Sequence, residues 1–195
     1  MSTAKADEPT SGDLVTVRSG FWTFIAADAG LFLLLFLQFS LDRVQDRNSF
    51  ITDQGQLHPV VALINTLVLI TGSWFAASAV HALSMARHRT ARRLTLATFT
   101  CGAVFVPLKI SEYIQVAQAG HSPTTSTFFM YYFVITGIHL LHLFGGIVAL
   151  LVAARQMGDA TEGLAPGALL EPITVYWHLV DVLWIFIFPL LYLVR

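Results

Sequence analysis

Four ionisable side chains lie within two strongly apolar segments in the last third of the chain. His139 and His142 occur in GIHLLHLFGG, and His178 and Asp181 occur in YWHLVDVLWIFIFPLLY. The members of each pair are three residues apart, so in a helix both would lie on one face. Paired imidazoles can ligate a metal ion, or they can hydrogen-bond to carboxylates. Ionisable groups are costly in hydrocarbon and usually find partners inside a helical bundle.

A metal site is the first of two interpretations of these residues. It would need more ligands than one histidine pair supplies, and His178, Asp181 or Glu112 could complete it. The second interpretation, which we favour, is a buried hydrogen-bond network, because unpaired polar groups in hydrocarbon are costly. The members of the predicted network are Lys109, Glu112, His139, His142, His178 and Asp181. On this interpretation the chain has no catalytic residue and no metal site.

Two more polar positions occur in earlier apolar segments. Lys109 and Glu112 are three residues apart in PLKISEYIQ, which predicts an ion pair on one helix face. Asp28 lies in FWTFIAADAGLFLLLFLQF without an opposite charge within a helical turn. It is either a hydrogen-bonded packing residue or a proton-accepting or lipid-contacting group, and both interpretations stay open.

Small and aromatic residues indicate how the helices meet. Gly137, Gly145 and Gly146 would let neighbouring membrane helices approach closely. Trp177 follows Tyr176 at the entry of its apolar segment, where we expect an aromatic residue of the membrane interface.

The elements that must position these residues are membrane helices. The mean hydropathy is +0.68, with 55% hydrophobic and 12% charged residues, which is typical of a polytopic membrane protein. A helix needs about 20 apolar residues to cross the hydrocarbon core. Five stretches are long enough, at about 20–41, 59–84, 94–117, 126–154 and 173–194. The predicted fold is therefore an all-α bundle of five transmembrane helices.

The remaining composition limits domains, partners and orientation. The formal net charge of −1 argues against nucleic acid as a partner, and the single Cys101 excludes an internal disulfide. Residues 1–19 are predicted to be a flexible cytoplasmic tail, and residues 20–195 the membrane domain. The loop 85–93, MARHRTARR, carries four arginines and is expected in the cytoplasm. The N-terminus would then be cytoplasmic and the C-terminus outside.

At these motifs the chain resembles subunit III of the haem-copper oxidase superfamily, which includes cytochrome c and quinol oxidases. That family carries a Gly-x-His-x-x-His segment with following glycines and a Trp-His-Phe-Val-Asp-x-x-Trp segment. Here they read GIHLLHLFGG and WHLVDVLW, with Leu179 in place of the usual phenylalanine. The Glu112–Tyr113 pair, STFF (126–129) and Arg155–Gln156 also fit, and the resemblance runs from about Phe21 to Arg195.

The resemblance implies an accessory, non-catalytic subunit of a respiratory oxidase, of the short five-helix bacterial form and of the cytochrome c oxidase type. It implies a place in the bacterial inner membrane beside subunits I and II, which would hold the haem and copper. This chain itself would bind no redox cofactor but would bind phospholipid, with support for complex stability and proton uptake. By position Asp28 matches the family's membrane-embedded carboxylate, and Arg155 matches a basic residue near lipid headgroups.

Two departures from the family pattern leave a second partner complex open. Ala27–Asp28 stands where the family usually has Ser-Glu, and Lys109 stands where it usually has glutamine. Both resemble small subunit-III-like proteins associated with bacterial nitric oxide reductases. The sequence does not decide between oxygen and nitric oxide as acceptor, or between cytochrome c and quinol as donor.

Two other function classes are less favoured. A stand-alone di-iron hydroxylase or desaturase needs about eight clustered histidines, whereas this chain has seven, four of them in loops or near span ends. A proton-coupled transporter would use Asp28 and the Lys109–Glu112 pair. The sequence shows no internal repeat to support that class.

Overall fold

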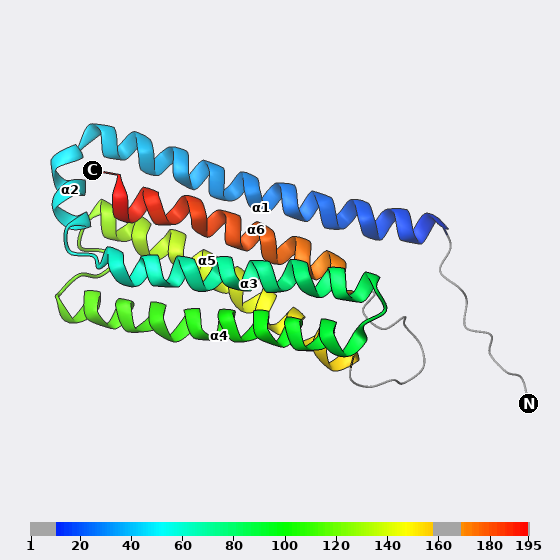
Figure 1. Ribbon diagram of the computed structural model, residues 1–195. Coiled ribbons are helices and arrows are strands. Elements are labelled where there is room, and N and C mark those ends of the chain that lie inside the picture. The colour runs from blue at the N-terminus through cyan, green and yellow to red at the C-terminus, as the bar shows by residue number, and fades with distance from the viewer. Residues whose placement is uncertain (1–10, 158–168, 195) are drawn as a thin grey trace, which may run out of the picture.

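The computed structural model describes residues 11–157 and 169–194, and only helices occur among them. The helices are α1 (Ser11–Gln45), α2 (Arg47–Gln54), α3 (Pro59–Ser84), α4 (His88–Gln118), α5 (Thr127–Gln156) and α6 (Leu170–Phe188), and α6 continues into the π-helical turn η1 (Pro189–Leu193). Figure 1 shows the five long helices lying along one another as a bundle, with α2 across one end.

The prediction of an all-α membrane bundle is confirmed. In the part of the chain that the structure describes, five helices are long and apolar enough to cross a membrane: Ser19–Gln45, Pro59–Ser84, His88–Gln118, Thr127–Gln156 and Leu170–Leu193. These ranges match the five predicted stretches except at their ends, where helix continues into the polar flanks.

Two of those flanks differ from the sequence expectation. The arginine-rich stretch was expected as a loop over 85–93, but α4 begins at His88, so most of it forms the first turns of that helix. The turn before it contains Ala86 with a φ of 57°. The stretch 42–58 contains the short helix α2, which is capped by Asp46 accepting from the Ser49 N–H at 3.3 Å. A hydropathy pattern does not predict α2 or the first turns of α4, because both are made mainly of polar residues.

The N-terminal region is also helical where the structure describes it. Helix α1 begins at Ser11, so residues 11–19 of the predicted tail belong to a helix. Residues 1–10 of that tail lie outside the described residues.

The centre of the bundle is built around the fully buried indole of Trp177. Three glycines from three different helices face it: Gly72 of α3, Gly102 of α4 and Gly146 of α5. A Cβ atom at Gly102 would lie 2.7 Å from Cη2 of Trp177, and one at Gly146 would lie 3.2 Å from its Cε3. The expectation that Trp177 lies at the membrane interface is therefore wrong, because the glycines form a slot that only a large flat side chain fills.

The three glycines predicted to mediate close approach behave differently from one another. Gly146 lies against Trp177, whereas a Cβ atom at Gly145 would meet only the Tyr176 hydroxyl, at 3.7 Å. A Cβ atom at Gly137 would meet no heavy atom within 4 Å outside the backbone of its own helix. Close helix packing on α5 thus occurs at one of the three positions.

Candidate functional site

A buried ion pair lies between α4, α5 and the end of α6. Lys109 Nζ is 3.0 Å from Glu112 Oε2, and both side chains are almost completely buried. The residues are one helical turn apart on α4, so the pair that the spacing predicted is formed within a single helix.

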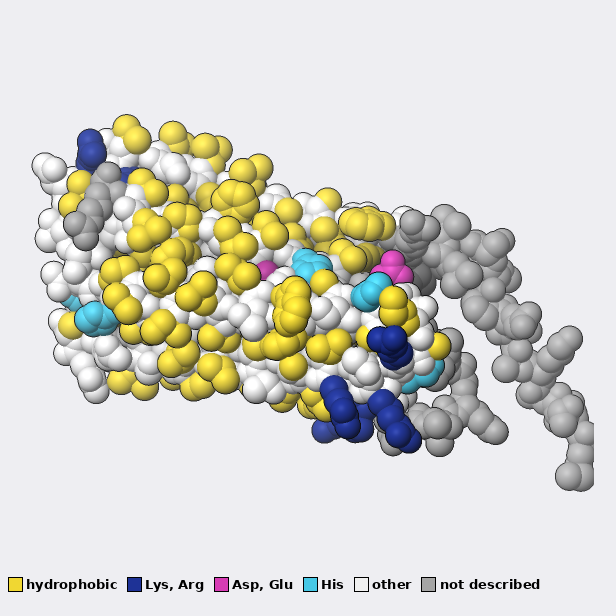
Figure 2. Space-filling view, viewed as in Figure 1, with side chains coloured by type: hydrophobic (Ala, Val, Ile, Leu, Met, Phe, Trp, Pro, Cys, Tyr) yellow, Lys and Arg dark blue, Asp and Glu magenta, His cyan; other side chains and the backbone are white. Residues whose placement is uncertain are grey.

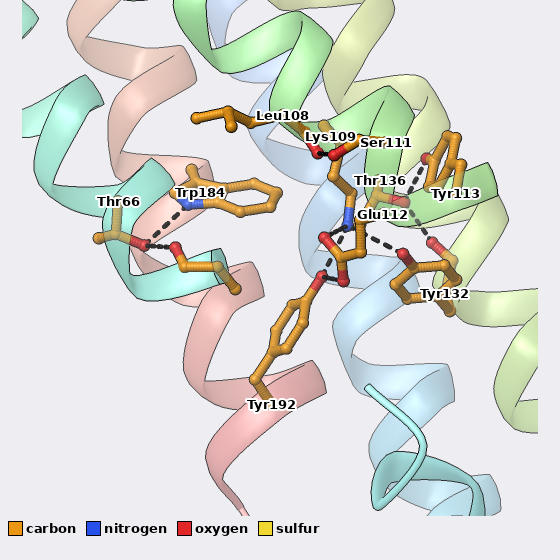
Figure 3. Close-up of polar contacts among 11 residues, drawn as sticks. Thr66, Leu108, Lys109, Ser111, Glu112, Tyr113, Tyr132, Thr136, Trp184 and Tyr192 are labelled. Atoms are coloured by element: carbon orange, nitrogen blue, oxygen red, sulfur yellow. Dashed lines mark hydrogen bonds and ion pairs between the residues drawn. The ribbon is translucent and has the colours of Figure 1, made fainter. Parts of the chain in front are cut away.

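Two tyrosines complete this site, and sequence reasoning missed both. Lys109 Nζ donates to the Tyr192 hydroxyl at 2.6 Å and to the Tyr132 hydroxyl at 3.2 Å, and the Tyr192 hydroxyl donates to Glu112 Oε1 at 2.6 Å. Figure 3 shows the tyrosine hydroxyls and the glutamate converging on the Lys109 amine. We refer to these four residues as the Lys109 cluster. The sequence did contain a signal for both tyrosines. Each lies inside an apolar span, and a buried tyrosine hydroxyl usually needs a hydrogen-bond partner.

Aromatic rings surround the charged amine. Lys109 Nζ lies 4.5 Å from the ring centroid of Tyr132 and 5.5 Å from that of Trp184. These distances are within the range of cation–π attraction. The three ammonium protons are matched by three oxygen acceptors, so the charge is compensated without water.

A carboxylate–imidazole contact joins α1 to α5. His142 Nε2 lies 2.8 Å from Asp28 Oδ1, so the carboxylate without a partner in its own helix finds one on another helix. The other imidazole nitrogen, Nδ1, lies 2.7 Å from the Ile138 carbonyl oxygen. Both nitrogens of His142 are therefore used, and the ring is fixed in orientation.

The remaining predicted network residues lie apart from these pairs. His178 Nδ1 is 2.6 Å from the Ser73 hydroxyl of α3. His139 is fully buried between the rings of Phe105 and Trp184, with centroid distances of 5.8 and 5.0 Å. Among the described residues neither ring nitrogen of His139 and neither carboxylate oxygen of Asp181 has a hydrogen-bond partner.

The six predicted network residues therefore do not form one hydrogen-bonded network among the described residues. The structure brings Lys109 to Glu112, but His142 pairs with Asp28 and His178 with Ser73. Within residues 11–157 and 169–194, no three His, Cys, Asp or Glu side chains gather in an arrangement that could hold a metal ion. What the arrangement does chemically is join helices by charge and hydrogen bond at bilayer depth.

Basic residues gather at one end of the bundle. Arg155 is exposed in the last turn of α5, and Arg92 in the first turns of α4 donates from Nε to the Ala154 carbonyl at 3.1 Å. Figure 2 shows one face of the bundle, and most of the Lys and Arg side chains on it lie at this end. Arg155 is therefore an exposed basic residue at the end of a helix long enough to span a membrane.

Comparisons with known proteins agree with the motifs. The family model for cytochrome c oxidase subunit III matches residues 12–194. Among curated proteins, the chain is 31% identical over 185 residues to the probable quinol oxidase subunit 3 of Staphylococcus epidermidis RP62A, covering 91% of this chain and 88% of that one. It is 32% identical over 177 residues to the quinol oxidase subunit 3 of Bacillus spizizenii W23, covering 89% and 85%.

These matches cover nearly all of this chain and of its relatives, and they include every helix that carries the ion pairs. The chain belongs to the cytochrome c oxidase subunit III family of the haem-copper oxidases.

Proposed function

We propose that the chain is the accessory, non-catalytic subunit III of a respiratory haem-copper oxidase in the bacterial plasma membrane. The observation that carries the proposal is that, among the described residues, Lys109 pairs with Glu112 and Asp28 with His142 at two separate helix contacts and not around one centre. Such pairs stabilise a bundle, and they leave the redox chemistry, with its haem and copper, to the partner subunits I and II.

Co-purification tests the accessory role. An affinity-tagged chain extracted in mild detergent from its native membrane is expected to recover a large haem-bearing subunit, visible as haem absorbance in the eluate. A tagged chain that purifies alone and catalyses uptake or oxidation in liposomes would contradict the proposal.

The electron donor is the finer part of the proposal. The motif resemblance suggested a cytochrome c oxidase, whereas the relatives reported above are named quinol oxidase subunits, which favours quinol for this complex. The purified complex should then oxidise a reduced quinol in oxygen-consumption assays much faster than reduced cytochrome c. The opposite preference would restore the cytochrome c assignment.

Association with a nitric oxide reductase is the second candidate. It rests on Asp28 and Lys109, the two departures from the family pattern. The same purified complex, supplied with its donor, distinguishes the two by consuming oxygen or by reducing nitric oxide under anaerobic conditions.

A supporting role in proton uptake is proposed for the Asp28–His142 pair. Asp28 is the buried carboxylate of α1, and it lies 2.8 Å from the His142 imidazole. Asp28→Asn keeps a hydrogen-bonding side chain of the same shape and removes the acid. We expect an assembled complex whose proton uptake is slowed modestly, by less than the roughly 10²- to 10⁴-fold that a group transferring the proton directly contributes.

The matched control is Asp42→Asn, also on α1 but near its end, where Asp42 accepts from the Tyr131 hydroxyl. It should leave proton uptake unchanged. Equal rates in assembled Asp28→Asn and wild-type complexes would restrict Asp28 to packing.

A phospholipid contact is proposed for Arg155. Its exposed side chain next to a span suits an anionic headgroup. Arg155→Gln should reduce the phospholipid that co-purifies with the complex, measured by phosphate analysis after extraction.

A further inference from the structure

The first membrane span, within α1, is buried against the bundle along only part of its length. Its buried residues are Asp28, Phe32 and Phe39, and no residue of the segment 19–27 is buried. Each of the other four spans has buried residues in both its first and its last third. Figure 1 shows α1 extending past the other helices at its N-terminal end. We refer to the segment 19–27 as the α1 arm.

A ring contact at the surface joins the α1 arm to α6. The rings of Phe24 and Tyr176 lie 6.1 Å apart between centroids, and Phe24 remains 50% exposed. The Thr23 hydroxyl donates to the Ser19 carbonyl of the same helix at 2.9 Å, so that hydrogen bond does not attach the arm to a neighbour. Segments with few buried apolar contacts are displaced at low free-energy cost, because no packed core has to be opened.

The opposite end of the same span is firmly packed. The buried ring of Phe39 lies 5.3 Å between centroids from Phe50 of α2 and 5.6 Å from Tyr131 of α5. The Tyr131 hydroxyl also donates to the Asp42 carboxylate near the end of α1. The C-terminal part of α1 is therefore fixed to two other helices, in contrast to the α1 arm.

Gly30 lies between two residues of α1 that both contact His142. Asp28 Oδ1 is 2.8 Å from His142 Nε2, and the ring centroid of Phe32 is 5.8 Å from that of the imidazole. A Cβ atom at Gly30 would meet no heavy atom within 4 Å outside the backbone of its own helix, so close packing does not require a glycine there. Glycine weakens the interior of a helix, so α1 bends most easily at this position.

We propose that Gly30 is a hinge about which the α1 arm swings, and that the Asp28–His142 contact is the latch that holds the arm against α5. When the contact breaks, the arm bends away from the bundle while Phe32 stays packed. A kink of about 20° at Gly30 moves the backbone at Trp22, about 12 Å away along the helix, by about 4 Å. The hinge belongs to this chain alone, so its test does not depend on the proposed function.

Distances between spin labels test the swing in the purified protein, reconstituted in lipid nanodiscs with the subunits that co-purify. In a Cys101→Ser background, nitroxides are attached to Trp22→Cys and Val148→Cys, which form the arm pair. The matched control pair is Leu37→Cys and Val134→Cys, on the same two helices, and all four positions are exposed. Double electron–electron resonance should give a broader distance distribution for the arm pair than for the control pair. Equal widths would overturn the hinge.

Two glycine substitutions locate the hinge. Gly30→Ala stiffens the helix without a clash, so it should narrow the arm-pair distribution to about the width of the control pair. Gly20→Ala is the matched control, because a Cβ atom there also has no neighbour within 4 Å but the residue lies inside the arm. It should leave the distribution unchanged. An unchanged width in Gly30→Ala, or equal narrowing in both variants, would show that the hinge is not at Gly30.

A third substitution tests the latch. His142→Leu removes the partner of Asp28, so the arm-pair distance should lengthen by about 4 Å, the displacement of a kink of about 20°. The control pair should keep its distance. An unchanged arm-pair distance would remove the latch, and an equal shift in both pairs would mean that α1 detaches as a whole, which also contradicts the proposal. The wild-type and glycine measurements decide the hinge without this variant.

Discussion

Lys109 shows how a full charge is kept inside a membrane helix bundle. Its amine has a carboxylate and two phenol oxygens within hydrogen-bond distance, and aromatic faces around them. Taking a lone ammonium out of water costs several kcal/mol, so each of these contacts offsets part of that cost. The Lys109 cluster also joins α4 to α5 through Tyr132, and to η1 at the end of α6 through Tyr192. It therefore holds three parts of the bundle together.

Removing one charge from the Lys109 cluster should destabilise the bundle more than removing both charges. Lys109→Leu leaves the Glu112 carboxylate buried with only the Tyr192 hydroxyl, so we expect a loss of about 3–5 kcal/mol. The double variant Lys109→Leu/Glu112→Leu should lose less than either single variant, because no uncompensated charge remains. The thermal unfolding midpoints of the detergent-solubilised complexes show which variant is the least stable. A double variant that equals the sum of the singles would show that the two charges do not interact.

The Asp28–His142 pair predicts a similar pattern at a different helix contact. His142→Leu leaves the buried Asp28 carboxylate without its imidazole partner, which should reduce the amount of chain incorporated into the complex. Incorporation is measured as tagged chain per haem. Adding Asp28→Leu should recover part of it, since the unpaired carboxylate is then gone. If the second substitution lowers incorporation further, the two residues act independently.

At the scale of elements, the packing of α3, α4, α5 and α6 depends on the glycine slot around Trp177. Methyl groups on those glycines would compete with the indole for the same space. A Cβ atom at Gly102 would lie 2.7 Å from Trp177 and 2.9 Å from Ile147, both of which are buried. Neither neighbour can move without displacing other core side chains.

Gly102→Ala should therefore destabilise the bundle by about 1–3 kcal/mol through overpacking. Gly137→Ala is the matched control, because a methyl group there meets nothing within 4 Å and alanine favours helix. The two variants are compared by their thermal unfolding midpoints in detergent. Equal midpoints would mean that the bundle adjusts around Trp177 without cost.

At the scale of the whole molecule, the arginine-rich end of the bundle predicts the orientation of the chain in the membrane. Arg155 and the first turns of α4 lie at one end of the bundle, and the 118–126 connection lies at the other. The positive-inside rule predicts that the arginine-rich end lies in the cytoplasm.

Cysteine labelling tests this orientation, because Cys101 is the single cysteine and can be replaced by serine. In that background, Thr124→Cys should react with a membrane-impermeant maleimide in intact spheroplasts. Arg89→Cys should react only in inverted vesicles. The reverse pattern would place the N-terminus outside.

The sequence by itself determined the membrane class, the five spans and the ion pair within one helix. Twenty apolar residues must span the bilayer as a helix, and two residues three apart on a helix must share a face, so these conclusions need no tertiary information. The motifs also determined the family, which the matches confirm.

Only the tertiary structure decided which polar groups meet. Asp28 finds His142 on another helix, Ser73 finds His178 across 105 positions, and Tyr192 reaches Glu112 across 80. Such pairings depend on how each helix is rotated about its axis and on which helices are neighbours. Packing decides both, here through a buried Trp177 that sequence position alone had placed at the membrane surface.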